Sequence, residues 1–526
     1  MPYRIIKREK KPGLTVGLFD VRVPCSGVPL EVKGDRVFLS PEEQHAMIVG
    51  SSGRGKTRRA IYPSVILSAR AGHSLIVLDP KGEIYRHTAA EVRKCGLDVK
   101  VLNLRSPGCG DRWSPLSLVE RYYKAGDNNK SRATMLIKDI AELVTADIAS
   151  TKDRYWQMAA CDTIVGFALF LLERDAKLTF SNIHALMNEF FSERDSRDAF
   201  RGILDSCADS YRRLTTLTNL DTEVTLSCVV SETNSALARY CDQADVRDLL
   251  LGSDFDMTDI GKSPTAYYIV VPDESTAMHP IAGLFIAQSY AELIRYADTR
   301  EDNTLPVRVD YVIDEFGSVP ASDWCSKLTA ARSRGIRFII SIQTVDQLYA
   351  RFGENQAKTI MGNCRTIEYL GGRDMNIMRL FEDLSGSQID RNGYEHPKLS
   401  VEQMAGMDMG QVIILDDSGK PRFGHLPDWE AWRIMAKADL SATRREILPE
   451  ERVSIADYTD DPLAGGGGDS IDVSKLSEGE RFDLLNQLCP PPTAEERALL
   501  ESIFPEAEDE ECTEENNTEN NDGIPF

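Results

Sequence analysis

Eight residues near the start of the chain, 50–57, read GSSGRGKT and fit the pattern G-x-x-x-x-G-K-[ST]. Glycines in this pattern let the backbone turn tightly, so that successive N–H groups face phosphate oxygens. The side chain of Lys56 can then reach the β- and γ-phosphates of a nucleotide, and the hydroxyl of Thr57 can bind Mg²⁺. The alternative interpretation is a flexible Gly/Ser turn. The predicted phosphate-binding residues are Gly50, Ser51, Ser52, Gly53, Arg54, Gly55, Lys56 and Thr57.

A pair of acidic residues, Asp314 and Glu315, follows the apolar run 309–313. In a phosphate-binding protein of this type, Asp314 would hold Mg²⁺ together with Thr57. Glu315 would orient and deprotonate the attacking water. An acidic pair after a strand is common by itself, so the interpretation depends on its combination with the glycine-rich loop.

Two further polar sites lie close to this pair in the sequence. Gln343 ends the apolar run 337–342, and its amide could position water beside the γ-phosphate. The segment 330–337, which leads into that run, contains three arginines, and Arg332 could act in trans on the nucleotide of a neighbouring subunit. The alternatives are a polar strand end for Gln343 and a solvated basic helix end for Arg332.

The elements that must position these residues alternate between strand-like and helix-like patterns. Strand-like runs occur at 46–49, 74–78, 99–104, 266–271, 307–313 and 337–342, and the continuous apolarity of 74–78 is typical of a parallel strand buried on both faces. Helical periodicity over 56–71, 84–95 and 279–296 separates them, although Pro63 should interrupt the first helix. We therefore predict an α/β fold with a parallel-rich sheet and right-handed crossovers.

The pattern changes between residues 118 and 221, where strand signals vanish and helical periodicity continues. We predict a small β-rich region over 1–44, a nucleotide-binding domain from 45–117 and 222–440, and an inserted all-α domain over 118–221. A helix over 222–240 should return the chain to the sheet. Residues 441–526 should form a linker and a largely disordered acidic tail.

Charge is distributed unevenly along the chain. Residues 451–526 contain 21 acidic and 4 basic residues, whereas the first 450 contain 62 acidic and 57 basic residues, so the net charge of −22 resides mainly in the tail. Overall acidity therefore does not exclude nucleic-acid binding, which local basic patches decide. The eleven cysteines form no C-x-x-C pair, which favours reduced thiols in a cytosolic protein.

Several ordered motifs together resemble the type IV coupling proteins, the TraG/TraD family of conjugative DNA-transfer ATPases, which are related to FtsK/HerA-type pumps. The resemblance runs over about 46–426 and includes, in order, GSSGRGKT, VLDPKGE (77–83), RWSPL (112–116), SDFDMTDIG (253–261), VIDEFGSVP (312–320), SIQTVDQLYARFG (341–353) and QVIIL (411–415).

The resemblance implies a RecA-like domain with an all-α insertion and a homo-hexameric ring around a DNA channel. It implies ATP and Mg²⁺ as cofactors, with Lys56, Glu315, Gln343 and Arg332 as catalytic residues, and Thr57 and Asp314 at the metal. Asp79 and Lys81, in the DPKGE segment, are expected near the nucleotide. The implied partners are DNA carried by a relaxase complex, the relaxosome and the proteins of a type IV secretion channel.

One departure from the family concerns the membrane. Family members typically begin with transmembrane helices, whereas this sequence contains no such run, and its longest apolar stretch, 164–172, is short for a bilayer. We expect a cytoplasmic protein that a separate membrane-anchor partner recruits to the inner face of the membrane, or one that acts away from a membrane. The function could be an ATP-driven coupling protein, a substrate-recruiting platform with little turnover, or a cytosolic DNA translocase of the FtsK/HerA type.

Overall fold

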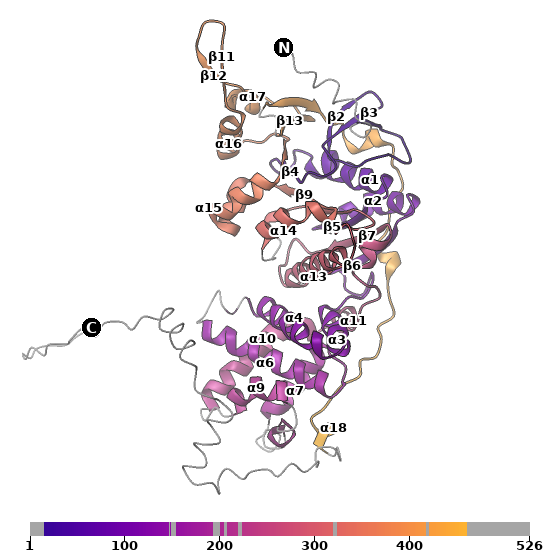
Figure 1. Cartoon of the computed structure of the whole chain (residues 1–526), viewed down its shortest axis with the longest axis vertical. Coiled ribbons are helices and arrows are strands. Elements are labelled where there is room, and N and C mark those ends of the chain that lie inside the picture. The colour runs from indigo at the N-terminus through magenta and orange to yellow at the C-terminus, as the bar shows by residue number, and fades with distance from the viewer. Residues whose placement is uncertain are drawn as a thin grey trace, which may run out of the picture. The chain divides into compact units, whose positions relative to one another are not determined.

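The computed structural model describes residues 15–146, 148, 154–192, 200–204, 208–218, 223–318, 323–416 and 420–459 (Figure 1). The predicted tail beyond 459 lies outside the described residues. Before the glycine-rich loop, β1 (Thr15–Gly17), β3 (Arg36–Leu39) and β2 (Pro29–Lys33) form a small antiparallel sheet. This agrees with the β-rich start expected from the sequence.

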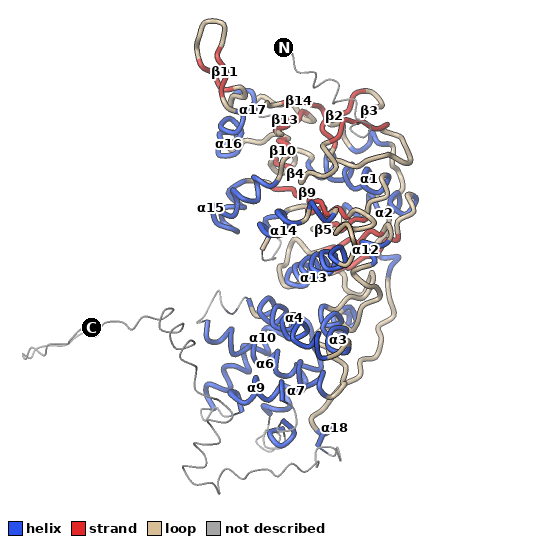
Figure 2. Tube along the Cα trace, viewed as in Figure 1, coloured by secondary structure: helices blue, strands red, loops and turns tan. Residues whose placement is uncertain are grey.

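Nine strands, drawn in red in Figure 2, form one sheet. The seven strands from β10 to β6 in the order below are parallel, whereas β13 and β14 continue the sheet in antiparallel pairing. The predicted α/β class with a parallel-rich sheet is therefore confirmed. In spatial order the strands are β14 (Arg422–His425), β13 (Gln411–Leu415), β10 (Thr366–Tyr369), β4 (Ala46–Val49), β9 (Ile336–Ile342), β8 (Val309–Ile313), β5 (Ser74–Asp79), β7 (Thr265–Val270) and β6 (Asp98–Asn103).

The central strands β4, β9, β8, β5 and β7 are buried along their whole length, and both faces of the sheet there are covered by hydrophobic clusters. One hydrophobic cluster joins the sheet to α1 (Tyr62–Arg70) and α2 (Glu83–Lys94). A second cluster joins the other face to α13 (His279–Asp298), α14 (Trp324–Ala330) and α15 (Val345–Asn363). Alternate strand residues serve the two clusters, as Met47 and Ile48 do.

The helix after the glycine-rich loop begins in an unusual conformation. Residues Thr57–Ile61 form a π-helical turn, and α1 then starts at Tyr62 with Pro63 in its first turn. The helical run continues across this junction, because Tyr62 N–H donates to Thr57 O, and Pro63, which has no N–H to donate, lies where the hydrogen-bond pattern changes from π to α. The predicted interruption at Pro63 is therefore a change of helix type at the start of α1.

Helices fill the segment between β6 and β7. Among the described residues they are α3 (Pro115–Lys124), α4 (Asp127–Val144), α6 (Arg154–Glu173), α7 (Phe180–Ser192), α9 (Ala208–Thr218), α10 (Glu223–Cys241), α11 (Ala244–Leu249) and the short α12 (Asp259–Lys262). The expectation for α10 was wrong, because this helix packs against α6 and α7 within the helical insertion and not against the sheet. Its apolar stripe is compatible with either partner, so periodicity alone could not decide.

Helix α6 is the core of the insertion, in contact with α4, α7, α9 and α10. Within the described residues it is the one helix with the length and hydropathy of a membrane span, at a mean hydropathy of 1.4, and 67% of that stretch is buried in the protein. A core helix of a bundle has the same composition.

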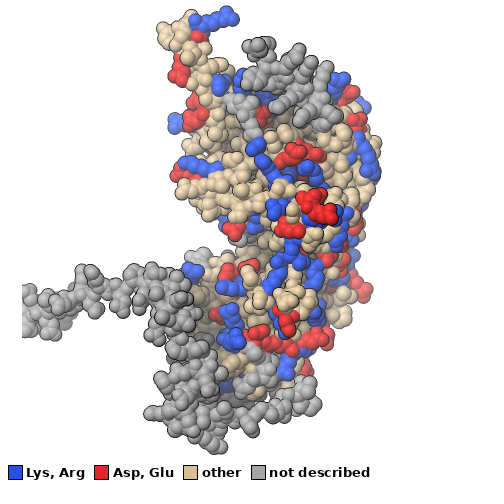
Figure 3. Space-filling view, viewed as in Figure 1, with Lys and Arg blue, Asp and Glu red and all other residues tan. Residues whose placement is uncertain are grey.

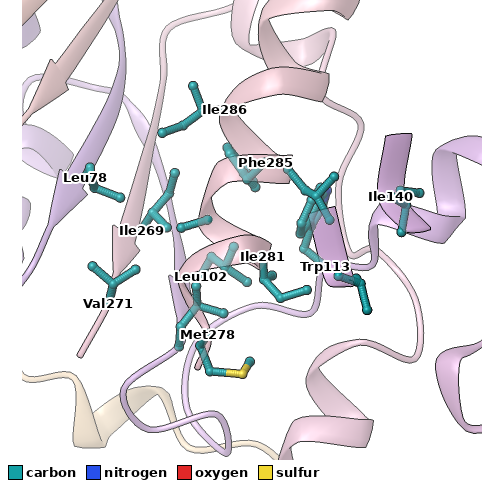
Figure 4. Close-up of a cluster of buried hydrophobic side chains, with 14 of the residues drawn as sticks. Leu78, Leu102, Trp113, Ile140, Ile269, Val271, Met278, Ile281, Phe285 and Ile286 are labelled. Carbon is teal, nitrogen blue, oxygen red and sulfur yellow. The ribbon is translucent and has the colours of Figure 1, made fainter. Parts of the chain in front are cut away.

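The joint between the insertion and the sheet is apolar at its centre (Figure 4). Trp113, from the RWSPL motif, packs edge-to-face on Phe285 of α13 with ring centroids 4.9 Å apart. Beside them, the buried Glu292 accepts hydrogen bonds from Tyr122 and Arg121 of α3. These contacts fix α3 against α13.

The segment expected to be a linker from residue 441 packs on the rest of the protein over its described part, 441–459. We call residues 433–459 the strap. Ala438 N–H donates to Arg86 O at 2.8 Å on α2, and Ser454 Oγ donates to Glu189 Oε1 at 2.8 Å on α7. The strap therefore contacts both the sheet domain and the insertion, which corrects the linker prediction for this segment.

Candidate nucleotide-binding site

The glycine-rich loop lies at the carboxyl ends of the parallel strands, between β4 and the π-helical turn. Gly53 and Gly55 have φ of +78° and +85°, which residues with a Cβ rarely adopt. The loop is fixed at its base, because Gly50 N–H donates to Ile342 O at 3.3 Å and Ser51 N–H donates to Gly371 O at 3.2 Å. Ser52 and Gly53 lie exposed at its crest.

Lys56 lies under this loop, with 8% of the residue exposed. Its ammonium donates to Gly50 O at 2.6 Å. Burial lowers the pKa of Lys56, and the nearby carboxylates of Asp314 and Glu315 act in the opposite direction. The ammonium group of Lys56 is thus held against the loop, where it could contact the phosphate oxygens of a nucleotide.

Thr57 and Asp314 are brought together as the sequence predicted. Thr57 Oγ1 donates to Asp314 Oδ2 at 3.0 Å, across 257 residues of sequence. The other carboxylate oxygen, Oδ1, accepts from the hydroxyl of Ser341 on β9. A hydroxyl and a carboxylate at one point fit the oxygen-ligand chemistry of Mg²⁺.

Glu315 and Gln343 are also neighbours. Gln343 Nε2 donates to Glu315 Oε1 at 3.2 Å. Glu315 has φ of +54°, which is uncommon for a residue with a side chain and is found mainly at functional sites or turns. The predicted acid and amide therefore lie together at the ends of β8 and β9.

Asp79 has a position that the sequence did not reveal. It ends β5 with 1% exposure and accepts hydrogen bonds from Tyr85 N at 2.8 Å and Lys81 N at 3.4 Å. Burial raises the pKa of its carboxyl to about 6, with the N–H groups acting in the opposite direction. Asp79 therefore fixes the turn between β5 and α2.

Lys81 lies on that turn with an exposed side chain. It lines a cavity of about 580 Å³ together with Arg86, Arg105 and the strap residue Ser441.

The arginines around the loop have protein partners. Arg54, predicted to bind phosphate, donates to Leu370 O at 3.2 Å and Met407 O at 2.9 Å. Arg58 and Arg59 both pair with Asp428, which follows β14. These contacts tie the loop and its helix to the antiparallel edge of the sheet.

Arg332 lies on a short 3₁₀ turn, Arg332–Arg334, with an exposed side chain. Within the described residues this side chain makes no hydrogen bond or ion pair, whereas Arg334 pairs with Asp298. No contact therefore brings Arg332 to the site of its own chain.

Sequence reasoning missed Ser341 and the anchoring of Arg54. Ser341 is a single polar residue in an apolar strand, which no spacing rule marks as functional. Its place beside Asp314 follows from the register in which β8 pairs with β9. The sequence predicts that these strands are neighbours but does not give their register.

Figure 3 shows acidic and basic side chains interspersed over one face of the described residues. This agrees with the nearly balanced charge of the first 450 residues. The mixture of charges on this face does not identify residues that would contact DNA.

Comparison with known proteins adds independent information. The family described as type IV secretory system conjugative DNA transfer matches residues 7–376. The type IV secretion system-coupling protein VirD4 of Bartonella quintana (strain Toulouse) is 25% identical over 161 residues, which are 30% of this chain and 24% of that protein.

Solved structures of the conjugative coupling protein TrwB have the same fold. Unbound TrwB lacking its first 70 residues superposes with a TM-score of 0.52 at 15% identity, covering 76% of this chain and 88% of the other. TrwB with a non-hydrolysable ATP analogue gives 0.53 at 15% identity, covering 78% and 89%. At these identities the likeness establishes the RecA-like α/β fold.

Proposed function

The chain belongs to the type IV secretory system conjugative DNA transfer family, and we propose that it is an ATP-hydrolysing coupling protein of this family. In this proposal it receives a relaxase–DNA complex from a relaxosome and drives it to a type IV secretion channel. The observation that carries the enzymatic part is the meeting of Thr57 and Asp314 beneath a glycine-rich loop that holds Lys56.

Relatives support the choice of ATP and Mg²⁺. TrwB has been solved with a non-hydrolysable ATP analogue and with ADP and Mg²⁺. In this chain Thr57 and Asp314 would hold the metal, which would supply positive charge to offset the charge of the nucleotide phosphates. The backbone N–H groups of residues 50–57 and the ammonium of Lys56 would bind the phosphate oxygens.

We assign the role of base beside the γ-phosphate to Glu315, and its hydrogen bond from Gln343 at the ends of β8 and β9 supports this assignment. Its carboxylate would accept a proton from water as the water oxygen bonds to the γ-phosphorus and the bond to the ADP oxygen breaks. Gln343, hydrogen-bonded to Glu315, would orient that water. Both groups come from strands buried in the sheet, which gives them a rigid base.

We also propose a homo-hexamer in which Arg332 acts on the nucleotide of the neighbouring subunit. Support comes from its exposure and from the absence of a partner for its side chain within the described residues. A stabilising arginine of this kind increases hydrolysis by about 10³–10⁵-fold in other nucleotide hydrolases. In the cell we place the protein at the inner face of the membrane, beside the secretion channel that it would serve.

DNA transfer from donor cells tests the proposal as a whole. Donors whose coupling protein carries Lys56→Ala or Glu315→Gln should transfer DNA at least about 100-fold less often than wild type, because phosphate binding or base catalysis is lost. Donors with Lys358→Ala, at an exposed ion pair with Glu354, serve as the control and should transfer normally. If donors with Lys56→Ala transfer DNA as often as wild type, the protein would instead be a recruiting platform without ATP turnover.

A further inference from the structure

Ser341 occupies a position that joins the two acidic residues of the nucleotide site. It lies on β9, is fully buried, and pairs in register with Ile48 of β4 on one side. On the other side β9 pairs with β8, whose last residue, Ile313, is opposite Ile340. Asp314 follows Ile313 and Ser341 follows Ile340, so Asp314 and Ser341 are neighbours on adjacent segments of the sheet.

The hydroxyl of Ser341 makes one bond to each acidic residue. It donates to Asp314 Oδ1, and it accepts the N–H of Glu315 at 3.2 Å. A serine hydroxyl has one hydrogen to donate and lone pairs to accept, so both bonds can exist together. With Thr57 bonded to Oδ2 of Asp314, both oxygens of that carboxylate are held.

The bond to the Glu315 N–H supports an unfavourable backbone conformation. Glu315 has φ of +54°, a region that residues with a Cβ seldom occupy unless surrounding contacts impose it. Its N–H is shared between Ser341 Oγ and Asp314 Oδ1, each at 3.2 Å. This conformation directs the Glu315 side chain to Gln343.

We propose that Ser341 is a positioning residue of the nucleotide site, because its hydroxyl fixes the metal-binding carboxylate and the backbone of the catalytic base at once. The inference rests on the proposed ATPase function. Ser341 touches neither nucleotide nor water in this account and acts through Asp314 and Glu315. Groups that hold a metal ligand in place typically affect metal affinity or activity by about 10–100-fold.

A merely structural serine would have a different signature. Ser289 provides the matched control, because it is also fully buried and its hydroxyl bonds to Tyr311 Oη of β8 at 3.0 Å. Tyr311 lies on β8, and Asp314 follows the end of that strand. The side chain of Tyr311 belongs to the hydrophobic cluster that contains α13. Ser289→Ala therefore removes a comparable buried hydroxyl without touching the acidic pair.

The experiment compares Ser341→Ala, Ser341→Thr and Ser289→Ala in the full chain. The first readout is binding of a non-hydrolysable ATP analogue as Mg²⁺ is titrated, and the second is kcat at saturating ATP and Mg²⁺. For Ser341→Ala we expect a Mg²⁺ half-saturation raised about 10-fold or more and a reduced kcat, with metal-free nucleotide binding unchanged. Ser341→Thr, which keeps the hydroxyl, should recover Mg²⁺ dependence, and Ser289→Ala should resemble wild type.

The proposal is overturned if Ser341→Ala retains wild-type Mg²⁺ dependence and kcat, or if both change only as much as in Ser289→Ala. Thermal unfolding of each variant identifies a general loss of folding, and a Ser341→Ala defect that Ser341→Thr does not recover also counts against it. If the wild-type protein hydrolyses no ATP, the proposed function fails, whereas the Mg²⁺ titration still tests Ser341 by itself.

Discussion

At the scale of single residues, Glu368 is the least expected member of the sheet. It lies on β10 beside the strand of the glycine-rich loop, is fully buried, and neither carboxyl oxygen has a hydrogen-bond partner within the described residues. Ile48 and Ile414 flank it on the adjoining strands. Burial raises the pKa of Glu368 well above its ordinary value.

This residue makes stability depend on pH in a definite direction. Because the folded pKa is raised, the cost of burying this carboxyl is smallest below the unfolded pKa of about 4.3, and stability falls as pH rises from there toward the folded value. Glu368→Met should therefore increase the free energy of unfolding by about 1–3 kcal/mol at pH 8, and by less at pH 5. Denaturant unfolding at the two pH values measures this.

Glu368→Gln is the control for charge, since it keeps a polar group of the same shape and removes the titration. Its gain over wild type should also be larger at pH 8 than at pH 5, but smaller than that of Glu368→Met at both. A Glu368→Met protein that is less stable than wild type at pH 8 would contradict this description of the site.

The sequence predicted the residues of the site unequally. Lys56, Thr57, Asp314 and Gln343 were identifiable because their chemistry is tied to loop spacing or to the end of an apolar run. Ser341 depends on strand register, which a sequence does not state. Arg54 was assigned to phosphate by position in the loop, whereas its guanidinium reaches the carbonyls of Leu370 and Met407.

At the scale of elements, the strap depends on one buried carboxylate. Asp248 of α11 accepts from Arg445 at 3.0 Å, from Arg112 at 2.8 Å, and from Leu448 N–H at 2.9 Å. Together these N–H groups and guanidinium charges hold the pKa of Asp248 below its ordinary value, against the opposing and larger single effect of burial. Asp248 therefore connects the RWSPL motif, the insertion and the strap, and we call this set of contacts the Asp248 joint.

Removing this carboxylate should release the strap. Asp248→Ala leaves two guanidinium groups without their anion, a loss of about 3–5 kcal/mol when such a pair is buried. Trypsin should then cleave after the exposed Arg452 faster than in wild type, while the sheet domain remains resistant. Glu354→Ala, which breaks an exposed ion pair with Lys358, should leave the cleavage rate unchanged. Equal rates in Asp248→Ala and wild type would show that the strap does not depend on this joint.

Elements with a clear apolar period were predicted well, and those held by polar contacts were not. The parallel strands and α13 follow from continuous apolar runs and a 3.6-residue stripe. The strap has neither pattern, because ion pairs and backbone hydrogen bonds order it. The partner of α10 was also unpredictable, since a stripe indicates that a face is buried but not against which element.

At the scale of the whole molecule, the account joins three features that lie far apart in sequence. These features are the glycine-rich loop, the acidic pair and Gln343, and they meet at the carboxyl ends of the parallel strands. The helical insertion is fixed to that sheet through α13 and the strap. In the proposed function, ATP turnover at this site is the event that would couple nucleotide state to the insertion.

ATP turnover by the purified full chain, with and without DNA, therefore tests the central claim most directly. Wild type should hydrolyse ATP in a Mg²⁺-dependent manner and faster with DNA, whereas Lys56→Ala and Glu315→Gln should be at least about 100-fold slower under the same conditions. Equal turnover by wild type and both variants would contradict the account, because the hydrolysis would then arise elsewhere than at this site.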